Sequence, residues 1–461
     1  MKPPFDIAAD LDTPVSAYLK LKPFRPRFLL ESVEGGERLA RYSFIGFGDC
    51  LELRLDERGL TIDGRTTPAP ASQRELLDAF RAALARAPQP GPYIAGVPLL
   101  GGLVGVAGYD LVRRFERLPP RIATTEPTPE AHYLAPRSLL VFDHLTRAIA
   151  LLHAGGEAER AALRKEVIAA LRGPLPQNGK PVRYSPPIGS LSEAEFIRAV
   201  QRTKQYIAAG DVYQLVLSVR FAGRCELEPF ETYRALRLLN PSPYMYYCDI
   251  GDCVVVGSSP EALVKLSHGR AQMRPIAGTR PRGEDAAHDA RLEAELLADP
   301  KENAEHVMLV DLARNDLGRV AKAGSVNVSP YRSIERYSHV MHIVSGVNGE
   351  LAPGKDAFDL FAAAFPAGTL VGAPKVRAME IIDELEPVRR GFYGGTVGYF
   401  GNGGDMDQAI TIRTMVFRGD EYSFQAGAGI VADSVPEMEY REVLAKSAIV
   451  RRAIATAEEG L

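Results

Sequence analysis

Residues 425–446 read QAGAGIVADSVPEMEYREVLAK, and both the fold class and the functional hypothesis start from this stretch. It reads as a short strand, a Gly-Ala-Gly turn at 427–429, and a helix that is opened by Ser434 and Pro436. Serine is a favoured N-cap residue, and proline suits the first turn of a helix. We therefore predict a strand–turn–helix unit near the C-terminus.

The predicted helix carries three charged residues on one face, because Glu439, Glu442 and Lys446 are spaced three and four apart. Two neighbouring carboxylates repel each other unless a cation lies between them. Gly427 and Gly429 have no side chain, so their backbone N–H groups can approach an anion closely. The combination predicts a site for a carboxylated ligand, although a solvated acidic helix after an ordinary turn explains this stretch equally well.

A second helix, over ADPKENAEHVMLVDLARND at 298–316, repeats the acidic spacing. Asp299, Pro300 and Glu302 form a favourable start with a predicted capping box. Glu302 and Glu305 then fall three apart on one face. If the two helices face each other, four carboxylates converge without a soft ligand, a set that suits Mg²⁺. Capping alone would explain Glu302, but it does not explain Glu305.

The composition excludes several classes of protein. The chain has 461 residues, a net charge of −3 and no long run of one charge sign, so nothing indicates binding to nucleic acid or to an anionic membrane. The spacing of the four cysteines fits neither a zinc site nor a disulfide framework. The first residues lack the apolar run of a signal peptide, and no stretch is long and apolar enough for a membrane span. We expect a cytoplasmic protein.

The order of strands and helices predicts an α+β fold. Residues 1–172 alternate short strands with turns, with a helix at 73–86, a Gly-rich strand that becomes a helix within 99–116, and a Pro-rich surface loop at 119–136. Residues 173–190 are rich in proline and glycine and are predicted to be a linker. Residues 191–461 mix clustered strands with long helices, which excludes a regular βαβ alternation. The first of these helices is predicted from a capping box at Ser192 and Glu195 to about Ala209.

Four further stretches place small or charged residues among apolar strands. Gly278 and Thr279 follow a strand, Glu261 follows a Ser-Ser-Pro turn, and a Gly-rich loop leads into a helix at about Pro374. Arg413 is predicted inside an apolar strand, where a buried guanidinium needs a carboxylate partner. Each stretch alone has a structural explanation, but together they suggest a pocket for a small dianion.

These and other segments resemble the chorismate-binding enzymes, and above all the large aminase component (component I) of the anthranilate synthases. The motifs that carry the resemblance are GDVYQLVLSVRF, NPSPYMYY, SSPEALV, RPIAGTRPRG, AEHVMLVDLARNDLGRV, SHVMHIVSG, FPAGTLVGAPKVRAMEIIDELEP, YGGTVGYF and AGAGIVADSVPEMEYRE. They cover residues 192–455 in order, and FLLESVEGGERLARYSFIG extends the likeness into the N-terminal third. The resemblance implies antiparallel sheets packed with helices in a layered β/α/α/β core, with residues 191–461 as the catalytic domain.

The resemblance also implies a chemistry, namely addition of ammonia at C2 of chorismate, loss of the C4 hydroxyl, and elimination of pyruvate to give anthranilate. It assigns Mg²⁺ to Glu305 and Glu442, supported by Glu302 and Glu439. Glu261 is the expected general acid for the departing hydroxyl, with a raised pKa, and His342 is expected to move the C2 proton. The implied substrate-binding residues are Gly278, Thr279, Tyr393, Arg413, Gly427, Ala428, Gly429 and Lys446.

Two positions are expected to set the product within the family. Gln214 stands where isochorismate and salicylate synthases have the lysine that activates water, and glutamine cannot act as a base. Ala277 stands where aminodeoxychorismate synthases have a lysine that directs amination to C4. The pair therefore predicts anthranilate as the product. Val443 and Ala445, and the pair Leu370–Val371, depart from more polar residues of the family pattern.

The family also suggests partners and a regulator. Ammonia is expected from solution or from a separate glutamine amidotransferase subunit (component II), and L-tryptophan is expected to bind in a feedback pocket. The residues expected in that pocket are Glu31, Ser32, Pro243, Tyr244 and Met245. Two other hypotheses remain open: an aminodeoxychorismate or aminodeoxyisochorismate synthase, and a tryptophan sensor without catalytic activity.

Overall fold

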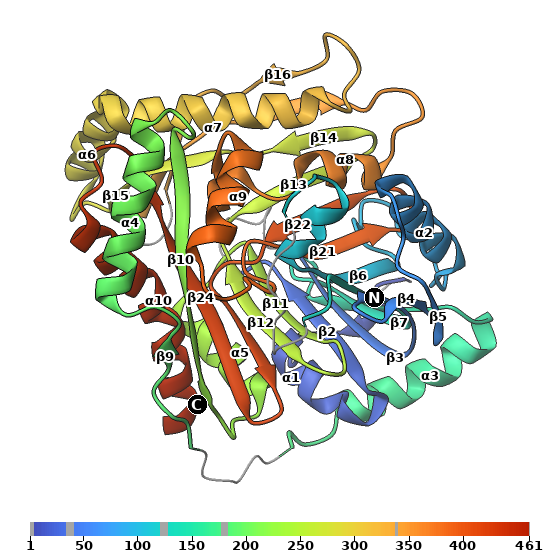
Figure 1. Ribbon diagram of the computed structural model, residues 1–461. Helices are drawn as coiled ribbons and strands as arrows, with labels where there is room; N and C mark the ends of the chain where they lie inside the picture. The colour runs from blue at the N-terminus through green and yellow to red at the C-terminus, as the bar shows by residue number, and fades with distance from the viewer. Residues whose placement is uncertain (1–3, 34–40, 120–127, 177–182, 337–339, 461) are drawn as a thin grey trace.

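The computed structural model describes residues 4–33, 41–119, 128–176, 183–336 and 340–460. Parts of the predicted linker and of the predicted Pro-rich loop, at 177–182 and 120–127, lie outside these residues. The described strands form one sheet of 21 strands and a second sheet of three, and the paired strands within them run antiparallel. In Figure 1 the helices lie around the sheets, with α7 along one end and α10 and α4 beside β10 and β24. The α+β class predicted from the sequence is confirmed.

Helices occur along the whole chain, between groups of strands. The α-helices are α1 Pro14–Lys20, α2 Gln73–Arg86, α3 Glu157–Leu171, α4 Glu193–Ala208, α5 Pro229–Leu239, α6 Ala286–Ala298, α7 Pro300–Gly318, α8 Ala357–Ala364, α9 Lys375–Leu385 and α10 Pro436–Glu459. The 3₁₀ helices are η1 Lys22–Phe24, η2 Tyr109–Arg114 and η3 Gly368–Leu370. Of the described helices, none is both long enough and apolar enough to cross a membrane.

The strands follow in chain order. In the first 190 residues they are β1 Ile7–Ala8, β2 Pro26–Glu31, β3 Tyr42–Asp56, β4 Gly59–Ile62, β5 Arg65–Thr67, β6 Gly102–Ala107, β7 Ala131–Asp143, β8 Ala148–His153 and β9 Ile188–Gly189. After them come β10 Gln214–Arg224, β11 Tyr244–Asp249, β12 Val254–Ser259, β13 Ala262–Ser267, β14 Arg270–Met273, β15 Ile276–Pro281, β16 Asn327–Val328, β17 Ser333–Arg336, β18 Val340–Val344, β19 Val347–Glu350, β20 Gly372–Ala373, β21 Thr396–Gly401, β22 Met406–Ile410, β23 Thr414–Arg418 and β24 Glu421–Ile430.

Three helices begin where the sequence predicted them, and two of these have a side-chain cap. The capping box of α4 forms between Ser192 and Glu195, as predicted. The helix predicted at 73–86 is α2, and the Ser72 side chain caps it. The helix predicted after the Gly-rich loop is α9, with Pro374 at its N-cap. Local polar side chains compete for the first free N–H groups of a helix, so such starts are visible in sequence.

Several local predictions were wrong, and one of them is that Gly278 and Thr279 follow a strand, since both lie inside β15. Gly427–Gly429 is not a turn, because these residues pair with β10 inside β24. Ser434 does not cap α10; Val435 is the N-cap, and the Ser434 hydroxyl accepts a bond from the Val431 N–H at 3.0 Å. Arg413 lies in the turn between β22 and β23 with φ of 49°, and not inside a strand. Within the predicted Pro-rich surface loop, residues 131–136 form the buried start of β7.

The N-terminal third and the remainder share one sheet. Strand β2 pairs with β11, with Phe28 opposite Cys248 at one end and Glu31 opposite Met245 at the other. Strand β6 pairs with β21 over its whole length. Part of the predicted linker also joins the sheet, since β9 pairs with β10. An aromatic cluster continues the contact, with Phe358 stacked on Phe400 at 4.5 Å between ring centroids and in edge contact with Phe80 of α2.

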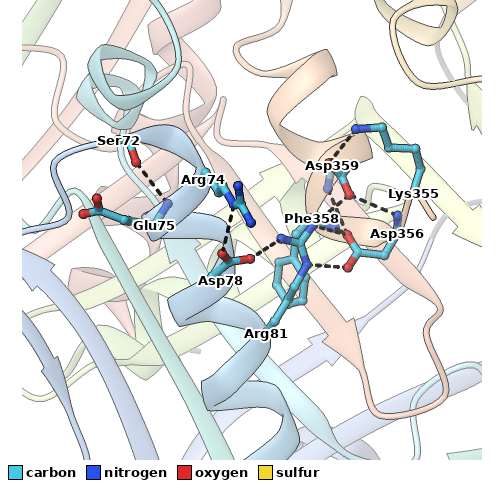
Figure 2. A network of polar contacts seen from close by, with 9 residues as sticks. All are labelled: Ser72, Arg74, Glu75, Asp78, Arg81, Lys355, Asp356, Phe358 and Asp359. Atoms are coloured by element: carbon cyan, nitrogen blue, oxygen red, sulfur yellow. Dashed lines mark hydrogen bonds and ion pairs between the residues drawn. The ribbon is translucent and has the colours of Figure 1, made fainter.

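A polar network joins the same two parts of the chain at the surface (Figure 2). Arg81 of α2 donates to both carboxylate oxygens of Asp356, at 2.7 and 3.1 Å, and to Asp359 at 2.7 Å. Asp356 is the N-cap of α8, and its side chain accepts from the N–H groups of Phe358 and Asp359. Arg81 therefore ties the cap of a C-terminal helix to an N-terminal helix.

Candidate active site

The start of helix α7 presents its acidic residues toward β15. The Asp299 side chain caps the helix by accepting from the Lys301 and Glu302 N–H groups at 2.9 and 3.2 Å. The Glu302 carboxylate does not complete the predicted capping box; it lies 3.4 Å from the Arg280 guanidinium of β15. Only the aspartate half of that box therefore forms, and Glu302 is held toward the neighbouring sheet.

Helix α10 presents its charged residues toward β24. The Lys446 ammonium lies 2.6 Å from the Glu442 carboxylate and donates to the Gly427 carbonyl of β24 at 3.2 Å. Glu439 interacts through its charge with both Glu442 and Lys446. The three side chains therefore lie on one face of the helix, as predicted.

The carboxylates of the two helices are close enough to affect each other. Burial raises the pKa of Glu305, and the charges of Glu302 and Glu442 raise it further, against a lowering hydrogen bond from Gln214. Burial and the charge of Glu442 likewise raise the pKa of Glu439. Residues from α7 and α10, more than a hundred positions apart, therefore lie close enough for their charges to interact.

A divalent cation fits the chemistry of this place, because like charges pressed together are relieved by a positive ion. In the described part of the chain, however, no three His, Cys, Asp or Glu side chains are arranged closely enough to hold a metal ion. Glu302 and Glu442 instead contact Arg280 and Lys446. Both would have to turn from these cations to bind a metal.

Strands β10 and β24 form the floor beside the carboxylates. Ser218 of β10 pairs with Gly427, and Val216 pairs with Gly429. A methyl group on Gly429 would lie 2.8 Å from the Gln214 amide nitrogen, and one on Gly427 would lie 2.7 Å from the Tyr393 hydroxyl. The missing side chains make room for Gln214 and Tyr393, and the glycines do not form the anion-binding turn that the sequence predicted.

Strands β15 and β18 form the wall next to α7. Gly278 adopts φ of 66°, and a methyl group on it would lie 3.1 Å from the Glu302 carboxylate. His342 of β18 places its Nδ1 2.8 Å from the Gly278 carbonyl and 3.2 Å from the Thr279 hydroxyl. The three residues predicted from the RPIAGT and VMHIV segments therefore lie together, beside Glu302.

Glu261 occupies the short connection between β12 and β13. Its carboxyl group accepts a hydrogen bond from the Thr369 hydroxyl at 2.9 Å. Burial raises the pKa of Glu261 to about 7, although Thr369, Lys446 and Arg413 each lower it. A carboxylic acid with this pKa keeps its proton in a large fraction of molecules at neutral pH, as a general acid must.

The structure adds two residues that the sequence reasoning did not single out. Thr369, inside the Gly-rich loop that precedes α9, is the hydrogen-bond donor to Glu261. Arg280, directly after Thr279, is the cation beside Glu302. Both could have been found from the sequence, because Thr369 lies in the predicted Gly-rich loop and Arg280 directly follows the predicted Thr279. The departures at Leu370, Val371 and Val443 are buried apolar side chains, whereas Ala445 is exposed.

Apart from the residues described so far, a cavity of about 200 Å³ lies between β2, β11, β21 and β22. It is lined by all five residues predicted for regulation: Glu31, Ser32, Pro243, Tyr244 and Met245. The sequence reasoning missed Asp407 and Lys265, which also line it. The Tyr244 hydroxyl donates to Asp407 at 3.1 Å, while Glu31 is held by Tyr233 and by Arg237 at 3.0 Å.

Comparisons with known proteins agree with this architecture. The chain matches the chorismate binding enzyme family over residues 25–452. It is 47% identical to anthranilate synthase component 1 of Thermus thermophilus over 460 residues, covering 98% of this chain and 97% of the relative. The same component of Pseudomonas aeruginosa is 45% identical, with 99% and 96% covered.

A solved structure gives the same result for the fold. The crystal structure of anthranilate synthase component I from Streptococcus pneumoniae superposes with a TM-score of 0.79 at 35% identity, covering 89% of this chain and 92% of that one. The chain therefore belongs to the chorismate-binding enzyme family, together with these anthranilate synthase component 1 proteins.

Proposed function

We propose that this enzyme aminates chorismate at C2 with ammonia and then eliminates pyruvate to give anthranilate, the first step of tryptophan biosynthesis. The observation that carries the proposal is the charge interaction between Glu305 of α7 and Glu442 of α10, beside the floor strands that carry Gln214 and Gly427. A dicarboxylate ring needs cationic and hydrogen-bonding partners on several sides. Arg413 of the turn between β22 and β23, Lys446 of α10 and Tyr393 of the segment before β21 would supply them.

Mg²⁺ is the proposed cofactor, held by Glu305 and Glu442 with Glu302 and Glu439 in support. When bound, it would neutralise the ring carboxylate of chorismate and the repulsion among the four glutamates. Gly278, Thr279 and the Gly427–Gly429 backbone would line the ring, and Arg413 would hold the enolpyruvyl carboxylate. These assignments are the ones that the resemblance to the chorismate-binding enzymes implies, and the oxygen donors of the glutamates suit Mg²⁺.

The proton transfers fall to two residues. Glu261 is the proposed donor to the C4 hydroxyl, which leaves as water, and the Thr369 hydroxyl orients the carboxyl group. His342 is proposed to take the C2 proton when pyruvate is eliminated, and its contact with the Gly278 carbonyl fixes its ring. Gln214 has no basic group and Ala277 no amine, which favours ammonia as the nucleophile and C2 as its target.

Ammonia is proposed to come from a separate glutamine amidotransferase subunit, or from ammonium in solution. The relatives are named component 1, which implies that those proteins have a second component. L-Tryptophan is the proposed inhibitor, in the cavity of about 200 Å³ that contains Glu31, Ser32 and Met245. A cytoplasmic location is consistent with this role.

The test is a direct assay with chorismate, MgCl₂ and ammonium chloride at alkaline pH, following anthranilate fluorescence and pyruvate together. We expect both products in equal amounts, and loss of both with excess EDTA. A 4-amino product would instead identify an aminodeoxychorismate synthase. An aminated product without pyruvate would identify an aminodeoxyisochorismate synthase, and tryptophan binding without turnover a sensor.

A further inference from the structure

Arg390 is a buried arginine behind the candidate active site, and only 3% of its surface is exposed. Its Nε and Nη2 atoms donate to the two carboxylate oxygens of Glu386, at 2.9 and 2.7 Å. Glu386 also accepts from the N–H and the hydroxyl of Ser218 in β10, at 2.9 and 2.7 Å. The ion pair is therefore fully hydrogen-bonded and anchored to the floor strand.

The remaining guanidinium bonds of Arg390 reach two backbone segments of the site. Nη1 donates to the Leu370 carbonyl at 2.6 Å, and Nη2 donates to the Val216 carbonyl at 2.8 Å. Leu370 directly follows Thr369, the donor to Glu261, and Val216 lies two residues beyond Gln214. One guanidinium thus connects the loop of Thr369, which donates to Glu261, to strand β10, which begins at Gln214.

Aromatic rings cover the guanidinium of Arg390. Its Cζ lies 4.9 Å from the ring centroid of Tyr109 in η2 and 5.5 Å from that of Tyr393. Tyr393 in turn places its hydroxyl next to Gly427 of the floor. Tyr109 is bound to the Arg390 segment a second time, because its N–H donates to the Gly391 carbonyl at 2.8 Å.

We propose that Arg390, held by Glu386, is a positioning residue that fixes the 368–371 loop, and through Thr369 the general acid Glu261, against the floor strand β10. This inference rests on the proposed function. The planar guanidinium is suited to the task because it donates in several fixed directions at once, which a lysine ammonium on a flexible chain does not reproduce. A buried charge with four directed bonds also restrains its neighbours more than apolar packing of the same volume.

The role predicts a specific kinetic pattern. In the chorismate–ammonia assay, Arg390→Lys should lower kcat by about 10- to 100-fold, because small displacements of a catalytic group have effects of this size. The KM for chorismate should change much less, because the lysine retains the charge beside Glu386. Thr369→Val should also lower kcat, and the double variant should be no slower than the slower single variant, because both changes act on the same contact to Glu261.

Arg81→Met is the matched control, since Arg81 also makes several carboxylate bonds but lies in the α2–α8 network away from the site. Its kcat should equal that of the unaltered protein. The proposal is overturned if Arg390→Lys leaves kcat unchanged, if its effect multiplies with that of Thr369→Val, or if Arg81→Met lowers kcat as much.

Hydrogen exchange provides a test that needs no turnover. Arg390→Lys should speed amide exchange in the 368–373 segment without a comparable change in α2 or α8, while Arg81→Met should do the reverse. Unchanged exchange in the 368–373 segment overturns the positioning role. Absence of anthranilate from the unaltered protein overturns the proposed function alone, because the exchange comparison still decides whether Arg390 holds the loop.

Discussion

Glu261 shows how a single residue is tuned by opposing forces. Burial raises its pKa to about 7, while the Thr369 hydroxyl and the charges of Lys446 and Arg413 lower it. The protonated form is the proposed donor, so activity should fall as the pH rises through the pKa of Glu261. With free ammonia held constant, kcat/KM for chorismate should decline above about pH 7, because this parameter reports the free enzyme.

Thr369→Val checks the assignment of that decline. Removing the hydroxyl removes a bond that lowers the pKa of Glu261, so the decline should move to higher pH. Glu261→Gln should abolish the decline together with most of the turnover, a loss of about 10²- to 10⁴-fold. A decline at the same pH in Glu261→Gln would assign it to another group.

Glu305 offers a second prediction at the scale of the residue. Burial and the charges of Glu302 and Glu442 raise the pKa of Glu305, so the folded, metal-free protein favours the protonated carboxyl group. The stability that this protonated group contributes is therefore lost as the pH rises through the raised pKa. Glu305→Gln removes this unfavourable charge. At neutral pH in EDTA, its Tm should therefore be at least as high as that of the unaltered protein.

The same variant should lose function, because glutamine cannot replace an anionic Mg²⁺ ligand. Anthranilate formation should become undetectable, and added MgCl₂ with chorismate should no longer raise the Tm. Asp311→Asn is the matched control, since Asp311 is an exposed acid on the same helix, paired with Arg314. Unchanged turnover in Glu305→Gln would refute the metal assignment.

At the scale of elements, sequence predicted what local chemistry determines. The caps of α4 and α2 and the single-sided acidic spacing of α7 and α10 depend on residues within one or two turns, so their patterns are visible in the chain. Whether Gly427–Gly429 forms a turn or a strand depends on β10, more than two hundred residues away. Pairing between distant strands overrode the turn preference of glycine.

In the candidate site, too, some features were visible in the local sequence and others depend on packing between distant segments. The spacing of the acidic residues indicated the four glutamates, whereas His342 and the role of Glu261 came from the family resemblance. The structure places Glu305 close to the charges of Glu302 and Glu442, and His342 beside Gly278. The partners of these residues were not visible in the same way. Arg280 reaches Glu302 because β15 packs against α7. Glu386 and Arg390 are only four residues apart, but their bonds to Ser218 and Val216 exist because β10 packs beside them.

The α2–α8 network in Figure 2 gives a prediction for the pairing of elements. Arg81→Met leaves Asp356 and Asp359 without their shared cation, and Asp356 must still cap α8. Because the Arg81 side chain is 32% exposed, solvent offsets much of the loss, and we expect a destabilisation of about 1 kcal/mol.

Arg74→Ala is the control for this prediction. Arg74 also pairs with an aspartate in the network, at 3.7 Å from Asp78, but 92% of its side chain is exposed. Its Tm should not change measurably, whereas that of Arg81→Met should fall by about 1 °C, because the unfolding entropy of a 461-residue chain is large. Equal Tm values for the two variants would show that the network does not hold α8 to α2.

At the scale of the whole molecule, the sheet joins the proposed regulatory cavity to the proposed acid. Tyr244 of the cavity pairs with Ser259, two residues before Glu261, and the Glu261 carbonyl accepts from the Ile410 N–H at 2.9 Å. Ala409, next to Ile410, lines the cavity. A ligand that displaces β11 or β22 would therefore shift the backbone that carries Glu261.

Tryptophan binding can be measured without interference, because the chain contains no tryptophan. The indole emission of L-tryptophan should shift to shorter wavelength on mixing with the protein, and anthranilate formation should be inhibited over the same concentrations. Asp407→Asn should weaken both effects together, by about tenfold, because a partly buried carboxylate that lines the cavity is a strong partner for the amino group of the ligand, even beside Lys265 at 3.5 Å. Asp405→Asn is the matched control, since Asp405 lies next to the same strand but does not line the cavity and instead accepts from the His268 N–H. It should bind tryptophan as the unaltered protein does. Inhibition that persists in Asp407→Asn while binding is lost would separate the inhibitory site from this cavity.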